Sequence, residues 1–86
     1  MIFITLVKWK GMPKKDQVAQ GTKALEELRK QGIKMQMYWT LGRYDAVVFL
    51  EAPTEKDAMK VFLPWQDIIS TETMVGVPRE EAIKLL

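Results

Sequence analysis

Three side chains that could take part in chemistry stand together, because Arg43, Tyr44 and Asp45 directly follow Gly42. Arginine offers a planar fork of donors that fits carboxylate and phosphate groups, and aspartate can accept a proton. A tight turn needs only glycine, asparagine or aspartate. Arg43 and Tyr44 exceed that need, so we predict that they bind a ligand and that Asp45 is a candidate catalytic base.

The same turn also has an architectural interpretation. Gly42 permits an unusual φ angle, Asp45 can bond to nearby backbone N–H groups, and Tyr44 can cover an edge of the core. Arg43 and Asp45 would equally suit a salt bridge between subunits. The residue types alone leave these alternatives open.

Glu72 is the second candidate catalytic residue, because it stands between Thr71 and Thr73 in a predicted strand. A charge on an edge strand protects that edge against aggregation. A carboxylate that points into an enclosed interior can instead act as a general base. Without a known neighbour, both interpretations stay open.

Aromatic and basic residues give the remaining candidates. Trp65 stands in a predicted connector, where it can close over a pocket or join a dimer contact, and Tyr38 is a further candidate for ligand binding. Trp39 is interpreted as a core side chain. Lys14 and Lys15 oppose the dipole of the helix that they begin, and we interpret them as a solvated helix end, with an anion site as the alternative.

The chain of 86 residues contains no histidine and no cysteine. This composition excludes disulfides, thiolate metal sites and Ser-His-Asp or Cys-His catalysis, and we predict neither a metal nor a cofactor. A net charge of +2 does not suggest a nucleic-acid partner. No run of apolar residues is long enough to cross a bilayer. The apolar start MIFITLVKWK is expected to be a strand rather than a signal peptide. We therefore predict a cytoplasmic protein without a membrane partner.

Alternating and helical spacings predict the elements that position these residues. The expected order is a strand over 2–9, a helix from about 13 to 31, strands over 33–41 and 46–51 around a turn at 42–45, a helix between Thr54 and Pro64, a strand over 68–77 and a short C-terminal helix. This βαββαβ order predicts one α+β domain of ferredoxin-like fold over residues 1–86, with both helices on one face and strands 2–9 and 46–51 in the centre.

The first helix is expected to pack on the sheet through Val18, Gly21, Leu25 and Leu28. Gly21 costs up to about 1 kcal/mol against alanine inside a helix. A close approach between helix and sheet would explain this glycine.

The hairpin predicts which sheet face stays uncovered. If Leu41 faces Ala46, the side chains of Tyr38, Val47 and Phe49 point away from the helices. Monomers rarely leave such an apolar patch to water, and a chain this small buries little surface by itself. We therefore predict a homodimer or a higher assembly of dimers, formed sheet against sheet.

The stretch YWTLGRYDAVVFLEAP, followed by a helix and by STETMVGV, resembles the GYD domain family. The family is named after a Gly-x-Tyr-Asp turn, present here as Gly42, Tyr44 and Asp45. The resemblance extends over nearly the whole chain, including FITLVKW near the start. It implies a dimeric α/β barrel, in which two ferredoxin-like sheets close on each other, and it brings no catalytic assignment.

Two function classes follow. The first is a dimer that binds a small molecule or regulates without catalysis, with the ligand at the barrel mouth or between sheet and helices. The second, by analogy of fold alone, is a cofactor-independent enzyme such as an isomerase, a cyclase or a monooxygenase-like protein, with an acid–base set of Asp45, Glu72, Tyr38 and Arg43. An RNA-binding module shares the βαββαβ order but needs a basic and aromatic pattern on its third strand that this chain lacks.

Overall fold

The computed structural model describes all residues, 1–86. Its elements are β1 (Ile2–Trp9), α1 (Lys15–Lys30), β2 (Lys34–Trp39), β3 (Ala46–Glu51), α2 (Glu55–Phe62), the 3₁₀ turn η1 (Leu63–Trp65), β4 (Ile69–Gly76), α3 (Arg79–Ala82) and a second 3₁₀ turn η2 (Ile83–Leu85). The predicted βαββαβ order with a short C-terminal helix is confirmed.

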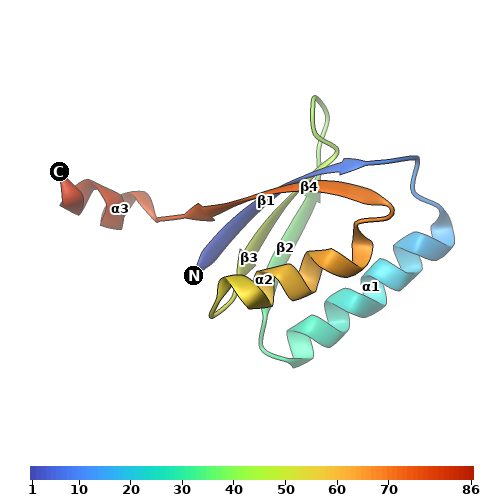
Figure 1. Cartoon of the computed structure of the whole chain (residues 1–86), viewed down its shortest axis with the longest axis horizontal. Coiled ribbons are helices and arrows are strands. Elements are labelled where there is room, and N and C mark those ends of the chain that lie inside the picture. The colour runs from blue at the N-terminus through green and yellow to red at the C-terminus, as the bar shows by residue number, and fades with distance from the viewer.

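The four strands form one sheet in the order β2-β3-β1-β4, and every neighbouring pair is antiparallel. The strands that are apolar on both faces, β1 and β3, lie in the centre, as predicted. Both longer helices lie on one side of the sheet, while the loop between β2 and β3 projects on the opposite side (Figure 1). This is the ferredoxin-like α+β fold.

The core lies between the sheet and α2. Its buried apolar side chains are Phe3, Val7, Met35, Ala46, Val48, Leu50, Ala52, Ala58, Val61 and Phe62. Thr5 is the one buried polar residue, and its hydroxyl shares a hydrogen bond of 2.8 Å with the hydroxyl of Thr73 on β4. At the start of α2 a capping box is present, because the hydroxyl of Thr54 accepts from the Asp57 N–H and the Asp57 carboxylate accepts from the Thr54 N–H.

Helix α1 corrects the prediction of a buried stripe. None of its residues is buried: Val18 is 42% exposed, and Gly21, Leu25 and Leu28 are only half-buried. A Cβ atom added at Gly21 would meet nothing within 4 Å, so the predicted close approach to the sheet is wrong. The residues of the predicted stripe instead line a space between α1 and the sheet.

The β2–β3 hairpin corrects the predicted register. Trp39 pairs with Ala46 and Met37 with Val48, a shift of two residues from the predicted pairing, and the connecting loop spans 40–45 rather than 42–45. Leu41 leaves the sheet and is fully exposed. A shift of two residues preserves which face each side chain occupies, because strand side chains alternate with a period of two.

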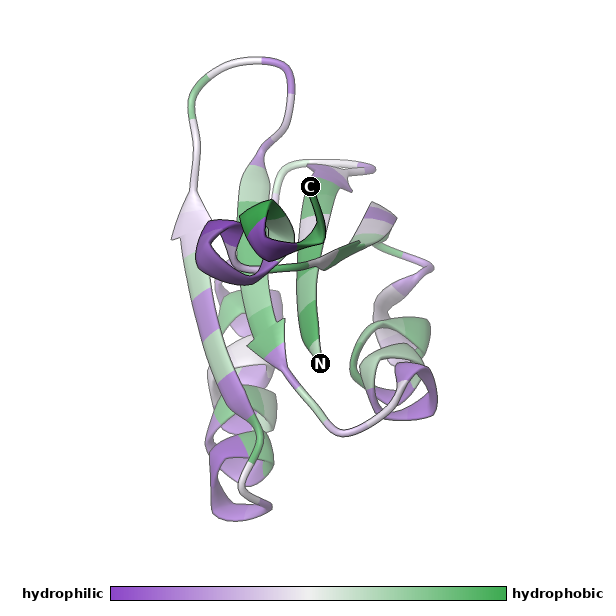
Figure 2. Ribbon diagram, turned by 90° about the vertical axis from the view of Figure 1, so that its left-hand side faces the viewer, coloured by the Kyte–Doolittle hydropathy of each residue, from purple (hydrophilic) through white to green (hydrophobic).

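The sheet face opposite the helices, here called the open face, has an apolar centre and polar residues toward its ends and edges. Its side chains, identified from strand register and alternation, include Ile2, Ile4, Leu6, Tyr38, Val47, Phe49 and Met74. Tyr38 is 54% exposed and Phe49 41% exposed, and their rings meet edge to face with centroids 6.2 Å apart. Figure 2 shows the hydrophobic colour along the central strands.

Residues 77–86, here called the C-terminal arm, extend away from the rest of the molecule (Figure 1). Val77, Ile83, Leu85 and Leu86 are all exposed there. The arm gives the molecule a long dimension of 46 Å against 32 and 18 Å in the other directions.

Candidate functional site

A cavity of about 510 Å³ lies between α1 and the sheet. It exists because α1 stands off the sheet, so the apolar residues of the helix line a space instead of filling it. Sixteen of its 24 lining residues are hydrophobic. Pockets that bind small molecules typically have this size and this mainly apolar lining.

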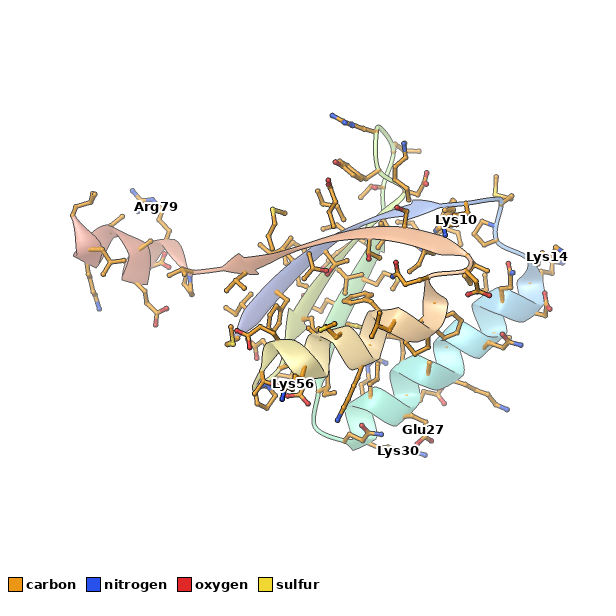
Figure 3. All side chains as sticks on the ribbon, in the orientation of Figure 1. Lys10, Lys14, Glu27, Lys30, Lys56 and Arg79 are labelled. Carbon is orange, nitrogen blue, oxygen red and sulfur yellow. The ribbon has the colours of Figure 1, made fainter.

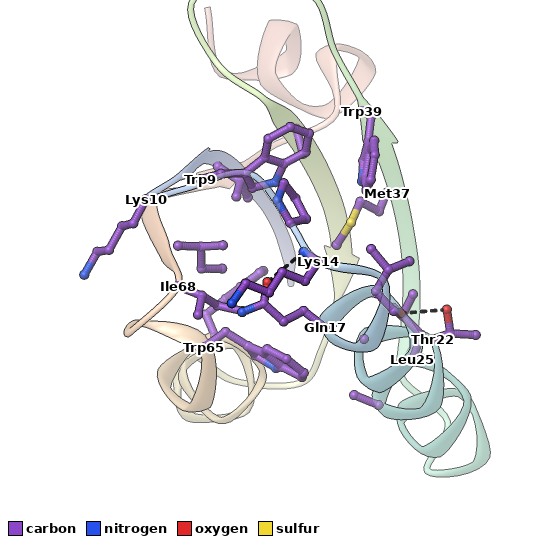
Figure 4. A pocket seen from close by; sticks show the side chains of 18 of the residues that line it. Trp9, Lys10, Lys14, Gln17, Thr22, Leu25, Met37, Trp39, Trp65 and Ile68 are labelled. Carbon is purple, nitrogen blue, oxygen red and sulfur yellow. Dashed lines mark hydrogen bonds between the residues drawn. The ribbon is translucent and has the colours of Figure 1, made fainter.

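All three tryptophans of the chain line this space, here called the tryptophan cavity. Trp9 ends β1 and Trp39 ends β2, and their rings meet edge to face with centroids 4.8 Å apart. Trp65 comes from η1 and lies on the other side of the cavity from this pair (Figure 4). Three separate elements thus bring their indole rings to one space.

This arrangement corrects the interpretation of Trp39 as a core residue. Trp39 lies on the predicted, helix-facing side of the sheet, but it is 61% exposed and stands at the cavity. Trp65, predicted to bind a ligand, does line the cavity. The sequence reasoning missed Trp9 and Gly21 as lining residues, although a glycine inside an amphipathic helix was a usable signal.

The other predicted site residues gather on the far side of the sheet. The Tyr44 hydroxyl donates a hydrogen bond of 2.8 Å to the Glu72 carboxylate, which links the hairpin loop to β4. The Arg43 guanidinium lies 5.7 Å from the centre of the Tyr44 ring. The hydrogen bond to Glu72 is the main cause that raises the pKa of Tyr44 above its ordinary 10.0, and the charge of Arg43 opposes the shift.

Asp45 bonds to the backbone of β1. Its carboxylate accepts a hydrogen bond of 2.8 Å from the Trp9 backbone N–H, and its own N–H donates to the Val7 carbonyl at 2.9 Å. These bonds extend the pairing of β1 and β3 by one residue ahead of Ala46, the first residue of β3. They match the architectural interpretation, in which this side chain bonds to nearby backbone.

The predicted residues therefore divide between two places. Trp65 lies at the tryptophan cavity, whereas Tyr38 lies on the open face and Arg43, Tyr44 and Glu72 form a chain of contacts from the loop to β4. No group of three or more acidic side chains is placed to hold a metal ion. No helix has the length and apolar character needed to span a membrane.

Comparison with known proteins places the chain in a family. The model of the GYD domain matches residues 3–86. The chain belongs to the GYD domain family. In this GYD domain the residues that carry the name, Gly42, Tyr44 and Asp45, form the loop that contacts β1 and β4. A comparison with curated proteins finds no match.

Among solved structures, this GYD domain is similar to a dimeric ferredoxin-like protein of unknown function from Thermobifida fusca YX. The two chains are 19% identical, the TM-score is 0.51, and the match covers 87% of this chain and 89% of the other. This likeness supports the ferredoxin-like fold.

Proposed function

We propose that this GYD domain is a homodimer that binds a small apolar molecule in the tryptophan cavity and does not itself catalyse a reaction. The observation that carries the binding proposal is the convergence of all three tryptophans on one cavity of about 510 Å³. Indole rings offer large, rigid apolar surfaces at little cost in conformational entropy, so they suit an aromatic or aliphatic ligand.

The dimer is supported by the amount of surface that one chain exposes. Its accessible area is 6650 Å², whereas a compact monomer of 10.0 kDa is expected to expose roughly 5,200 Å². The excess of roughly 1,450 Å² is larger than the area of about 800 Å² that each partner buries in a standard protein interface. The open face and the C-terminal arm supply uncovered apolar side chains, and the similar protein from Thermobifida fusca YX is described as dimeric.

Binding can be tested with 4-phenylbutanol, a neutral probe with an apolar body. Because every tryptophan lines the cavity, tryptophan emission reports directly on its occupation. Wild-type protein is expected to show a saturable change in emission. Gly21→Leu is expected to abolish it, since the new side chain projects into the cavity from a position where a Cβ has no neighbour within 4 Å.

Ala19→Leu is the matched control, because it enlarges an exposed side chain of the same helix that does not line the cavity. Circular dichroism checks that both variants keep the fold. No saturable change in the wild type, or equal affinity in Gly21→Leu, contradicts binding in this cavity.

A second candidate function is cofactor-independent acid–base catalysis on the open face. The specific observation behind it is the hydrogen bond between Tyr44 and Glu72, since Glu72 shares this face with Leu6, its partner in β1. A second copy packed on this face would shield the pair from water. If an activity is found, Glu72→Gln is expected to remove it while Asp45→Asn keeps it, and the reverse result contradicts this assignment.

A further inference from the structure

The tryptophan cavity is lined by few polar side chains, and they differ in the hydrogen bonds that they make. The charged and polar side chains that line it are Lys10, Lys14, Gln17, Thr22 and Asp67. Lys10 donates to the Gln66 carbonyl at 2.6 Å, and Thr22 donates to the Val18 carbonyl at 3.1 Å. Both side chains therefore already donate a hydrogen bond to the protein backbone.

Lys14 differs from Lys10 in the bonding of its ammonium group. Its backbone N–H donates to the Gln17 side-chain oxygen at 2.9 Å, but its ammonium group has no hydrogen bond and no carboxylate within 4.0 Å. In Figure 4 the Lys14 side chain extends across the cavity between Trp9 and Trp65, while Lys10 points outward. Both lysines lie at the end of the molecule where α1 begins, far from Arg79 (Figure 3).

A single side chain brings negative charge to the lining of the cavity. Asp67 is the only acidic residue in the lining. It lies between Gln66 and Ile68, which are the two residues that accept hydrogen bonds from Lys10. Asp67 thus lies between the two residues that bond to Lys10, and the Lys14 ammonium is the lining cation without a hydrogen bond or a carboxylate partner.

From this arrangement we infer that the tryptophan cavity takes an organic acid, with an apolar body among the indole rings and a single carboxylate on the Lys14 ammonium. The inference rests on the proposed function of the cavity as a binding site. A carboxylate and an ammonium group form a charge-assisted hydrogen bond, which is stronger than one between neutral groups. Asp67 disfavours a second negative charge on the ligand, because like charges in one site repel.

Three probes that share a phenylbutyl group distinguish binding in the cavity from a preference for a carboxylate. They are 4-phenylbutyrate, 4-phenylbutanol and 4-phenylbutylamine. Titrations at neutral pH use tryptophan emission on the full chain. The acid is expected to bind about five- to tenfold more tightly than the alcohol, and the amine more weakly than either. Lys14→Met is expected to remove the preference for the acid, so that the acid and the alcohol bind with equal affinity.

Lys15→Met is the matched control, because it removes the same charge from the neighbouring residue, which does not line the cavity. Lys14→Gln repeats the test if the methionine variant folds poorly. Binding of the alcohol without preference for the acid overturns the inference but leaves the proposed cavity function standing. A preference for the acid that survives in Lys14→Met also overturns it, and failure of all three probes contradicts the cavity function itself.

Discussion

At the scale of single residues, the bond between Tyr44 and Glu72 gives a prediction about pH. The Tyr44 pKa is raised in the folded protein, so the folded state holds this proton more tightly than the unfolded state. The stabilisation is therefore complete below the ordinary pKa of 10.0 and is lost as the pH rises through the raised value. We expect Glu72→Gln to lower the Tyr44 pKa toward its ordinary value.

The measurement is a spectrophotometric titration in a Tyr38→Phe background. The chain has two tyrosines, so this background leaves Tyr44 as the only phenol that titrates. Tyr44→Phe in the wild-type background should also flatten the fall in unfolding free energy at alkaline pH. An unchanged Tyr44 midpoint in Glu72→Gln would show that the negative charge of Glu72 does not raise this pKa.

Asp45 gives a second prediction at this scale. Removal of its carboxylate by Asp45→Ala leaves the half-buried Trp9 N–H without its partner at 2.8 Å. An unsatisfied backbone donor of this kind costs about 1–3 kcal/mol. Chemical denaturation should show this loss in Asp45→Ala, whereas Asp67→Ala, an exposed aspartate without a hydrogen bond, should change stability by less than about 0.5 kcal/mol.

At the scale of secondary-structure elements, α1 should tolerate a larger residue at its glycine. Gly21→Ala is expected to stabilise the protein by up to about 1 kcal/mol, because alanine favours the helix and its Cβ meets no neighbour within 4 Å. Gly32→Ala is the contrast, since Gly32 has a φ of +83° that L residues rarely adopt, and it should destabilise by roughly 1–2 kcal/mol. Thermal unfolding compares the two, and a destabilised Gly21→Ala would mean that α1 packs closely on the sheet.

At the scale of the whole molecule, the open face should control assembly. Phe49→Lys places a charge in the middle of this face and is expected to convert a dimer into a monomer in sedimentation equilibrium. Met59→Lys is the matched control, because Met59 is similarly exposed, at 55%, but belongs to α2 on the opposite side of the sheet. A wild-type monomer, or a dimer that survives Phe49→Lys, contradicts assembly through this face.

The sequence by itself determined the fold. The strands apolar on both faces indicated β1 and β3 as the centre of the sheet, and Thr54 marked the start of α2. Such signals are local, since alternation and capping depend on residues a few positions apart. The hairpin register was missed by two residues, because a loop of six residues offers no pairing signal of its own.

Only the tertiary structure decided that the three tryptophans share one cavity. The three tryptophans lie at positions 9, 39 and 65, and nothing in their spacing shows that they share one cavity. The helical period predicted which side of α1 faces the sheet, but not that this side would stay unburied, because a period reports direction and not distance from the sheet. Whether such a stripe fills a core or lines a cavity depends on the volume of side chains contributed by both surfaces, which only their packing in three dimensions reveals.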